Sequence, residues 1–366
     1  MNALSRRSWL RQSGLILSSI PLMSSYSIEG ELFSNDSIVR LGSNENPYGP
    51  SKKSLEAMTN ILAASNRYGS DSAGKLRDAV AKKHTLTREH VILGAGSSEL
   101  LGLTAQLGLL RGKELIAPNP TFKLWLRAAE KIGLTTVSVQ TGSDKQINLS
   151  DIARKISNQT AVIYLCNPNN PTGLVIKNEE LRNFIQNTPR HCLLLIDEAY
   201  LEYTNSSSVA DMTNSYPNLI VAKTFSKIYG LAGARIGYAV AHPDTVKQLN
   251  ELQPWNNNSV STPSLEAAHA SLSDTGFIQE TTTLNAEARS YFESRLAKLN
   301  IPFIKSETNF MYCSFQSTSK DVIKEMASRK FRIGPQFETE GNWIRISIGT
   351  KSEMERAANE LTTILS

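Results

Sequence analysis

The sequence predicts an α/β protein, in which a large domain has a mostly parallel sheet flanked by helices and a smaller domain is α+β. Three observations support this prediction. Helical and strand patterns alternate from about residue 50 onward, the later strands are continuous apolar runs, and a polar segment at residues 254–263 interrupts the alternation. Apolar strands that alternate with helices are typical of a parallel sheet buried on both faces.

The expected elements follow in order along the chain. Helices are expected at residues 51–64, 73–84 and 100–110, and strands at residues 91–93, 114–117, 161–166, 192–196, 219–222 and 234–241. A long helix at about residues 264–300 and an α+β segment follow the interruption. We therefore expect a signal segment at residues 1–30, a strip at 31–60 that joins the small domain, the large domain at 61–255 and the small domain at 256–366.

Composition places the chain among globular proteins. Hydrophobic residues are 40% and charged residues 20% of the 366 positions, which excludes disordered and collagen-like classes. The net charge is +5, but three basic residues precede residue 25 and no basic stripe carries interleaved aromatics, so nucleic acid is not an expected partner. The three cysteines and five histidines show no CxxC or HExxH spacing, so neither a disulfide framework nor a metal site is expected.

The first residues resemble a twin-arginine export signal. The stretch SRRSWLR at residues 5–11 matches the S-R-R-x-F-L-K pattern, with Trp9 in the aromatic position, and a mildly apolar run at residues 14–23 follows it. A charged start before a short apolar run is typical of signal peptides. We expect export to the periplasm by the twin-arginine machinery; the alternative is a cytoplasmic protein with a basic tail.

Polar groups follow three late strands at the points where those strands end. Asn170, Asp197 and Lys227 should converge, because ligands of open α/β sheets bind at the carboxyl ends of the strands. A lysine can form a Schiff base with a carbonyl cofactor, and a carboxylate can keep a pyridine nitrogen protonated. The Gly-Ser-Ser turn at residues 96–98 opens a helix and can bind phosphate. Together these groups predict a pyridoxal phosphate site.

Several short stretches carry a family resemblance in a fitting order: LGSNENPYGP, RYGS, GAGSSELL, NPTFKLW, NPNNPTG, DEAYLEY, TFSKIYGLAGARIGY and WIRISIGT. From about Leu41 onward the chain resembles the fold-type I, class I/II pyridoxal phosphate-dependent aminotransferases, and within them the histidinol-phosphate aminotransferase family. The resemblance implies a transaminase that moves an amino group from an amino acid, or a related histidinol-phosphate-like amine, to a 2-oxo acid by a ping-pong mechanism.

The resemblance also implies roles for individual residues at the cofactor. Lys227 would form the Schiff base and shuttle the proton, Asp197 would pair with the pyridine nitrogen, and Tyr200 would hydrogen-bond the ring hydroxyl and tune the Schiff base. The other residues implied to bind the cofactor within the subunit are Gly96, Ser97, Ser98, Phe122, Asn170, Thr224 and Arg235.

Substrate and subunit contacts follow from the same resemblance. Arg345 would hold the substrate carboxylate or an equivalent anionic group, and Asn46 would lie near the substrate. Tyr68 would reach the cofactor phosphate of a neighbouring subunit, so a homodimer is expected. The segment at residues 332–337 differs from the biosynthetic histidinol-phosphate enzymes, which bears on the choice of substrate. The alternative within enzymes is a decarboxylase of an amino acid or phospho-amino acid that uses the same cofactor.

Overall fold

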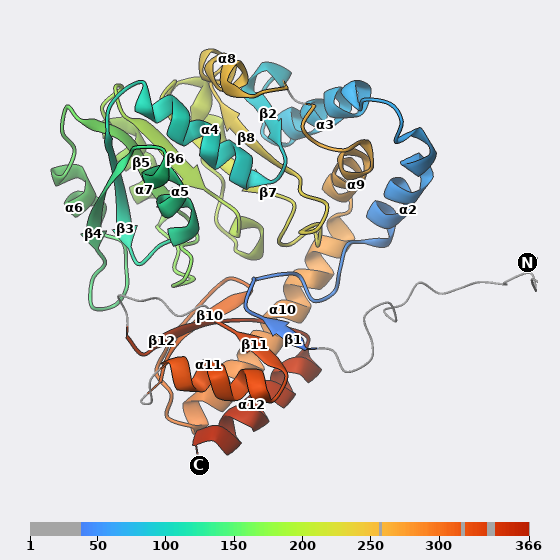
Figure 1. Cartoon of the computed structure of the whole chain (residues 1–366), viewed down its shortest axis with the longest axis vertical. Coiled ribbons are helices and arrows are strands. Elements are labelled where there is room, and N and C mark those ends of the chain that lie inside the picture. The colour runs from blue at the N-terminus through green and yellow to red at the C-terminus, as the bar shows by residue number, and fades with distance from the viewer. Residues whose placement is uncertain (1–37, 256–257, 316–318, 335–340, 366) are drawn as a thin grey trace, which may run out of the picture. The chain divides into compact units, whose positions relative to one another are not determined.

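The central sheet has seven strands in the order β2-β8-β7-β6-β5-β3-β4 (Figure 1). Its strands are β2 (Val91–Gly94), β3 (Glu114–Asn119), β4 (Thr135–Gln140), β5 (Thr160–Cys166), β6 (Leu193–Asp197), β7 (Leu219–Thr224) and β8 (Gly237–Ala241). β8 runs antiparallel to both neighbours, β2 and β7, and the remaining pairs are parallel. The prediction of an α/β fold with a mostly parallel sheet is confirmed.

The computed structural model describes residues 38–255, 258–315, 319–334 and 341–365, so the expected signal segment at residues 1–30 lies outside the described residues. The helices that accompany the sheet are α2 (Lys52–Ile61), η3 (Leu62–Ala64), α3 (Ser70–Lys83), η4 (Arg88–His90), α4 (Ser97–Leu109), α5 (Lys123–Lys131), α6 (Leu149–Arg154), α7 (Asn178–Asn187), η5 (Leu201–Tyr203), η6 (Ala210–Asn214), α8 (Pro243–Leu252) and α9 (Thr262–Leu272). None of the described helices combines the length and apolar character that a membrane crossing needs.

The second part of the fold is built on two smaller sheets. Strands β12 (Trp343–Ser347), β10 (Phe310–Ser314) and β9 (Phe303–Ile304) form an antiparallel sheet, and β1 (Val39–Leu41) pairs in parallel with β11 (Phe331–Ile333). The helices of this part are α10 (Thr275–Lys298), α11 (Ser319–Ser328) and α12 (Lys351–Leu365). The pairing of β1 with β11 ties the start of the described chain to this part of the fold (Figure 1).

Two separate groups of buried apolar side chains stabilise the protein. The first contains the strands of the central sheet, and the second contains residues of β1, β10, β11, β12 and the helices α10 and α12. Helix α10 belongs to both, because Ile278 packs against the first core while Phe292 and Leu296 lie in the second. Leu265 of α9 lies in the first core, although its position falls within the expected small domain at residues 256–366.

The single long helix expected at residues 264–300 is wrong. The structure has two helices there, α9 and α10, because α9 ends at Leu272 and α10 begins at Thr275. Asp274 separates them: its carbonyl oxygen accepts a hydrogen bond from the backbone N–H of Ile278, and its carboxylate pairs with Lys53 Nζ at 3.2 Å. The break therefore starts a new helix that reaches the second core.

Candidate active site

A cavity of about 640 Å³ lies at the carboxyl ends of the central strands. It is lined by Gly42, Ser43, Glu45, Ser97, Ser98, Phe122, Lys123, Leu124, Arg127, Cys166, Asn170, Asp197, Ala199, Tyr200, Thr224, Ser226, Lys227, Ala232, Gly233, Arg235 and Arg345. The expected convergence of Asn170, Asp197 and Lys227 is therefore observed. Arg345 from β12 and residues 42–45, which follow β1, enclose the cavity from the second part of the fold.

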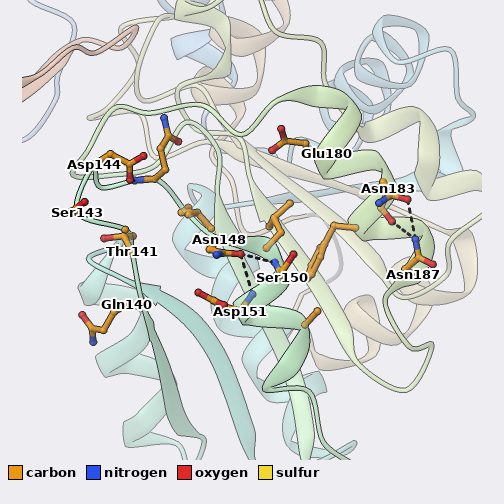
Figure 2. Close-up of a pocket in the computed structure, with 16 residues that line it drawn as sticks. Gln140, Thr141, Ser143, Asp144, Asn148, Ser150, Asp151, Glu180, Asn183 and Asn187 are labelled. Atoms are coloured by element: carbon orange, nitrogen blue, oxygen red, sulfur yellow. Dashed lines mark hydrogen bonds between the residues drawn. The ribbon is translucent and has the colours of Figure 1, made fainter.

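A second hollow, of about 890 Å³, lies between the segment that joins β4 to α6 and helix α7 (Figure 2). No lysine, arginine, histidine or cysteine lines it. Several of its polar side chains already bond locally: Asn148 Oδ1 accepts from the backbone N–H groups of Ser150 and Asp151, and Asn187 Nδ2 donates to the carbonyl oxygen of Asn183. This hollow offers neither a cation for an anionic cofactor nor an amine for a carbonyl group, so the smaller cavity is the candidate site.

Lys227 follows β7 and is the amine of the cavity. Its Nζ donates a hydrogen bond of 2.9 Å to the carbonyl oxygen of Ser43 and lies 5.6 Å from the centre of the Tyr200 ring. Burial lowers the pKa of Lys227 to about 8, with a further contribution from the positive charge of Arg345. A substantial fraction of this amine is therefore neutral at pH 8, which is the form that attacks a carbonyl carbon.

Asp197 ends β6 and presents its carboxylate to the same cavity. Tyr164 Oη donates to Asp197 Oδ2 at 2.9 Å, and the backbone N–H of Ala199 donates to Oδ1 at 3.2 Å. Burial raises the pKa of Asp197 to about 6, while these hydrogen bonds and the charge of Lys227 oppose the rise. The carboxylate is thus ionised above about pH 6 and can accept a further hydrogen bond from a group in the cavity.

Next to Asp197 in the cavity lining, hydrogen-bonded polar side chains connect β12 of the second part of the fold to the loops of the central sheet. Arg345 Nη1 donates to Asn170 Oδ1 at 2.8 Å, and Asn170 Nδ2 donates to Tyr200 Oη at 3.4 Å. Asn44 Nδ2 donates to the same hydroxyl at 3.1 Å. Burial raises the pKa of Tyr200, so this hydroxyl stays protonated. The buried Nε of Arg345 has no hydrogen-bond partner in the described part of the chain.

A narrow turn at the start of α4 forms the anion-binding end of the cavity. Gly96 has φ of +80°, and the Arg235 guanidinium lies directly against its Cα, where a Cβ would collide with it. A Cβ on Gly237 would lie 2.5 Å from the backbone nitrogen of Ser97. Both glycines thus let the helix N-terminus, two serine side chains and one guanidinium surround the same point, as a bound phosphate requires.

Three of the expected site residues do not line the cavity: Gly96, which precedes the two serines that do, Asn46 and Tyr68. Asn46 is buried, but it does not line the cavity; its Nδ2 donates to the carbonyl oxygen of Ile228 at 2.8 Å and holds the strip at residues 42–49 to the loop after Lys227. The Tyr68 side chain is 73% exposed and packs against Trp255, with ring centres 4.9 Å apart. Phe122 and Thr224 do line the cavity.

The sequence interpretation missed Asn44 and Tyr164. Asn44 has φ of +53° and is fully buried, and Ser347 Oγ donates to its Oδ1 at 2.8 Å. Its neighbour Asn46 is the same residue type two positions away, and no local pattern shows which of the two amides reaches Tyr200. Tyr164 carried a visible signal, because it is the one residue with a hydroxyl group in the apolar run at residues 161–166.

Residues 36–361 match the family model for aminotransferase class I and II. The chain belongs to this family, and it is a pyridoxal phosphate-dependent aminotransferase of the fold-type I architecture. The chain is 32% identical over 335 residues to a histidinol-phosphate aminotransferase of Moorella thermoacetica, with 90% of this chain and 86% of the relative covered. It is 33% identical over 329 residues to one from Methanosarcina mazei, with 88% and 86% covered.

Among solved structures, the chain resembles the histidinol-phosphate aminotransferase of Sinorhizobium meliloti in complex with pyridoxal 5′-phosphate. The TM-score is 0.84 at 26% identity, and the match covers 94% of this chain and 99% of that one. The decarboxylase alternative is not favoured, because these relatives are aminotransferases. The residues of the cavity fit the cofactor: a cradle for its phosphate, an ionised carboxylate for its ring nitrogen and an amine for its carbonyl carbon.

The pH dependence of cofactor capture follows from the environment of Lys227. We expect the rate at which the apoprotein combines with pyridoxal phosphate to rise with pH up to about 8 and then to level off, since only the neutral amine reacts. Below that pH the rate should fall about tenfold per unit. Absorption changes after rapid mixing measure the rate, and Lys131→Ala, on the exposed surface, should keep the profile. A rate independent of pH between 7 and 9 contradicts the assignment.

Proposed function

We propose that this aminotransferase takes an amino donor that carries an anionic group, with histidinol phosphate as the first candidate, and passes the amino group to a 2-oxo acid. One observation carries the proposal: Lys227, Asp197 and Arg345 come together in one cavity from three distant parts of the chain. The names of the relatives from Moorella thermoacetica and Methanosarcina mazei support the candidate donor.

In this proposal, different residues of the cavity bind different groups of the cofactor. The α4 turn with Ser97 and Ser98 would hold the phosphate together with Thr224 and Arg235, and Asp197 would accept a hydrogen bond from the protonated ring nitrogen. Asn170 and Tyr200 would hold the ring hydroxyl, and Phe122 would pack against the ring. Pyridoxal phosphate, when bound, supplies a conjugated ring that disperses the electron pair left at the donor Cα after deprotonation.

Lys227 moves the proton in both half-reactions. Its Nζ would take the proton from Cα of the donor in the first half-reaction and would deliver a proton to the corresponding carbon of the acceptor in the second. The lowered pKa of Lys227 suits this exchange near neutral pH. Both half-reactions use one cavity, so donor and acceptor compete for it and ping-pong kinetics follow.

Arg345 holds the anionic group of the donor. Its guanidinium donates to Asn170 Oδ1 and to the carbonyl oxygen of Gly42, which fixes its plane, and the side chain lines the cavity. Arginine favours such a site because its planar, permanently charged group binds carboxylate or phosphate through paired hydrogen bonds. Burial excludes water from the pair and strengthens it.

A panel of amino donors tests the proposed function. Histidinol phosphate, histidinol and common amino acids are added singly to the holoenzyme, and a donor is identified when the cofactor absorption band shifts and a 2-oxo product or aldehyde appears. Histidinol serves as the matched control, since it lacks only the phosphate. We expect Arg345→Lys to raise KM for the true donor more than tenfold. Release of carbon dioxide without an oxo acid contradicts the proposal.

We also propose a homodimer in which Tyr68 reaches the cofactor phosphate of the neighbouring subunit. The exposed Tyr68 and Trp255 rings support this, because a pair of large aromatic side chains at the surface is typical of an interface. Sedimentation equilibrium measures the mass, and Tyr68→Phe should weaken pyridoxal phosphate binding without changing the mass. A monomer at micromolar concentration contradicts the proposal.

Finally, we propose export to the periplasm by the twin-arginine machinery. The support is the motif at residues 5–11 together with the apolar run at residues 14–23. Cell fractionation of the full chain and of an Arg6→Lys/Arg7→Lys variant tests it. We expect the protein in the periplasmic fraction and the variant in the cytoplasm; equal cytoplasmic retention of both contradicts the proposal.

A further inference from the structure

Tyr164 is a fully buried tyrosine in the strand next to Asp197, and it does not line the cavity. It stands opposite Leu195 in the register between β5 and β6, so its side chain shares a face of the sheet with Asp197, two residues farther along β6. The hydroxyl of Tyr164 lies 2.9 Å from Asp197 Oδ2. Tyr164 thus contacts the carboxylate without itself lining the cavity.

The phenol ring of Tyr164 is fixed by its neighbour. The indole ring of Trp125 packs against it with ring centres 4.6 Å apart, and both side chains are buried. A phenylalanine would fill nearly the same space, so the hydroxyl is what distinguishes a tyrosine at this position. A buried hydroxyl needs a partner, and this one donates to the carboxylate that faces the cavity.

We propose that Tyr164 is a positioning residue, whose hydroxyl keeps the Asp197 carboxylate ionised and fixes the orientation in which it faces the pyridine nitrogen of the cofactor. The inference rests on the proposed role of Asp197. With Tyr164 on Oδ2 and the Ala199 N–H on Oδ1, the carboxylate cannot rotate without losing both hydrogen bonds. The remaining lone pairs are therefore presented to the cavity in one direction.

The surrounding charges explain why this hydrogen bond matters. The titratable groups around Asp197 are Tyr164 and Cys166 on β5, Lys227 after β7, and Glu198 and Tyr200, which follow Asp197 along the chain. Burial raises the pKa of Asp197, and among the interactions that oppose this rise, the hydrogen bond from Tyr164 is the largest. Without it the carboxylate would hold its proton to higher pH and would lose its charge opposite the ring.

The test compares Tyr164→Phe with Tyr238→Phe. Tyr238 is a buried tyrosine on β8 whose hydroxyl lies 3.1 Å from His84 Nε2, so its replacement removes one buried hydroxyl away from Asp197. Fluorescence titration of each apoprotein gives the dissociation constant for pyridoxal phosphate between pH 6 and 9. We expect Tyr164→Phe to raise this constant about tenfold at pH 7, increasingly so at lower pH, and Tyr238→Phe to leave it unchanged.

A second readout separates positioning from general damage to the fold. In Tyr164→Phe, the acid limb of the kcat profile should move to higher pH, because the pKa of Asp197 rises when the hydrogen bond is lost. A merely structural defect would instead lower kcat equally at every pH. In an Asp197→Asn background, Tyr164→Phe should have no further effect on cofactor affinity.

The outcomes distinguish this inference from the proposed function. If Asp197→Asn binds pyridoxal phosphate and turns over as well as the unaltered enzyme, the role of Asp197 is wrong and the inference fails with it. If Asp197→Asn is impaired but Tyr164→Phe keeps the original affinity and pH profile, the proposed function stands and the inference alone is overturned.

Discussion

Replacement of Lys227 by alanine should abolish transamination while leaving the fold intact. The lysine side chain contributes one hydrogen bond, to the Ser43 carbonyl, and its burial lowers its own pKa, so the folded state loses little when it is removed. Loss of a positioned proton-transfer group alone costs roughly 10²–10⁴-fold in rate. The covalent link to the cofactor disappears as well, so we expect kcat below detection in a coupled assay with the identified donor.

Two further variants sharpen this experiment. Lys227→Arg keeps the positive charge but offers no amine that can attack a carbonyl, and it should be as inactive as the alanine variant. Lys131→Ala, which removes an exposed lysine at the end of α5, should retain full activity and thermal stability. Activity above a tenth of the original in Lys227→Arg would show that the charge, and not the amine, is what the reaction needs.

Replacement of Lys223 by methionine should strongly destabilise the protein. Lys223 is 3% exposed on β7, and its Nζ lies 3.0 Å from Glu198 Oε2 and 2.8 Å from Glu202 Oε1. Burial opposes its charge, but Glu202 and Glu198 outweigh this and raise the pKa of Lys223. Removing one member of a buried ion pair leaves an uncompensated charge and costs about 3–5 kcal/mol. Urea unfolding of the apoprotein measures the loss.

The control for Lys223 is Lys247→Met on the exposed surface of α8, which should change the free energy of unfolding by less than about 0.5 kcal/mol. A triple variant, Lys223→Met with Glu198→Gln and Glu202→Gln, should recover part of the lost stability, since neutral amides need no counter-ion. A loss below about 1 kcal/mol in Lys223→Met would mean that the carboxylates take up protons or reach water instead.

The order of elements could be predicted from the sequence because each depends on local pattern. The apolar runs that became β5, β6 and β7 and the Ser51 cap of α2 are visible without coordinates. The direction of β8 could not be predicted, since an apolar strand reads the same in either direction. The break at Asp274 was missed because helical periodicity continues on both sides of it.

The candidate site was predictable where its residues follow strand ends, and unpredictable where contacts cross the fold. Topology alone brings Asn170, Asp197 and Lys227 together. The hydrogen bond from Arg345 to Asn170 joins residues 175 positions apart, and no local pattern indicates it. No local pattern shows which of Asn44 and Asn46 reaches Tyr200 either, because that contact is also long-range.

The contact between residues 42–46 and strand β12 affects the order in which the parts of the cavity can form during synthesis. The backbone N–H of Asn44 donates to Ser347 Oγ across 303 residues, and closing a loop of that length costs about 5 kcal/mol of chain entropy. On the ribosome, Lys227 and Asp197 are synthesised more than a hundred residues before Arg345. Arg345 is therefore the last residue of the cavity lining to be synthesised, and the site for the anionic group of the donor can be complete only after translation has passed β12.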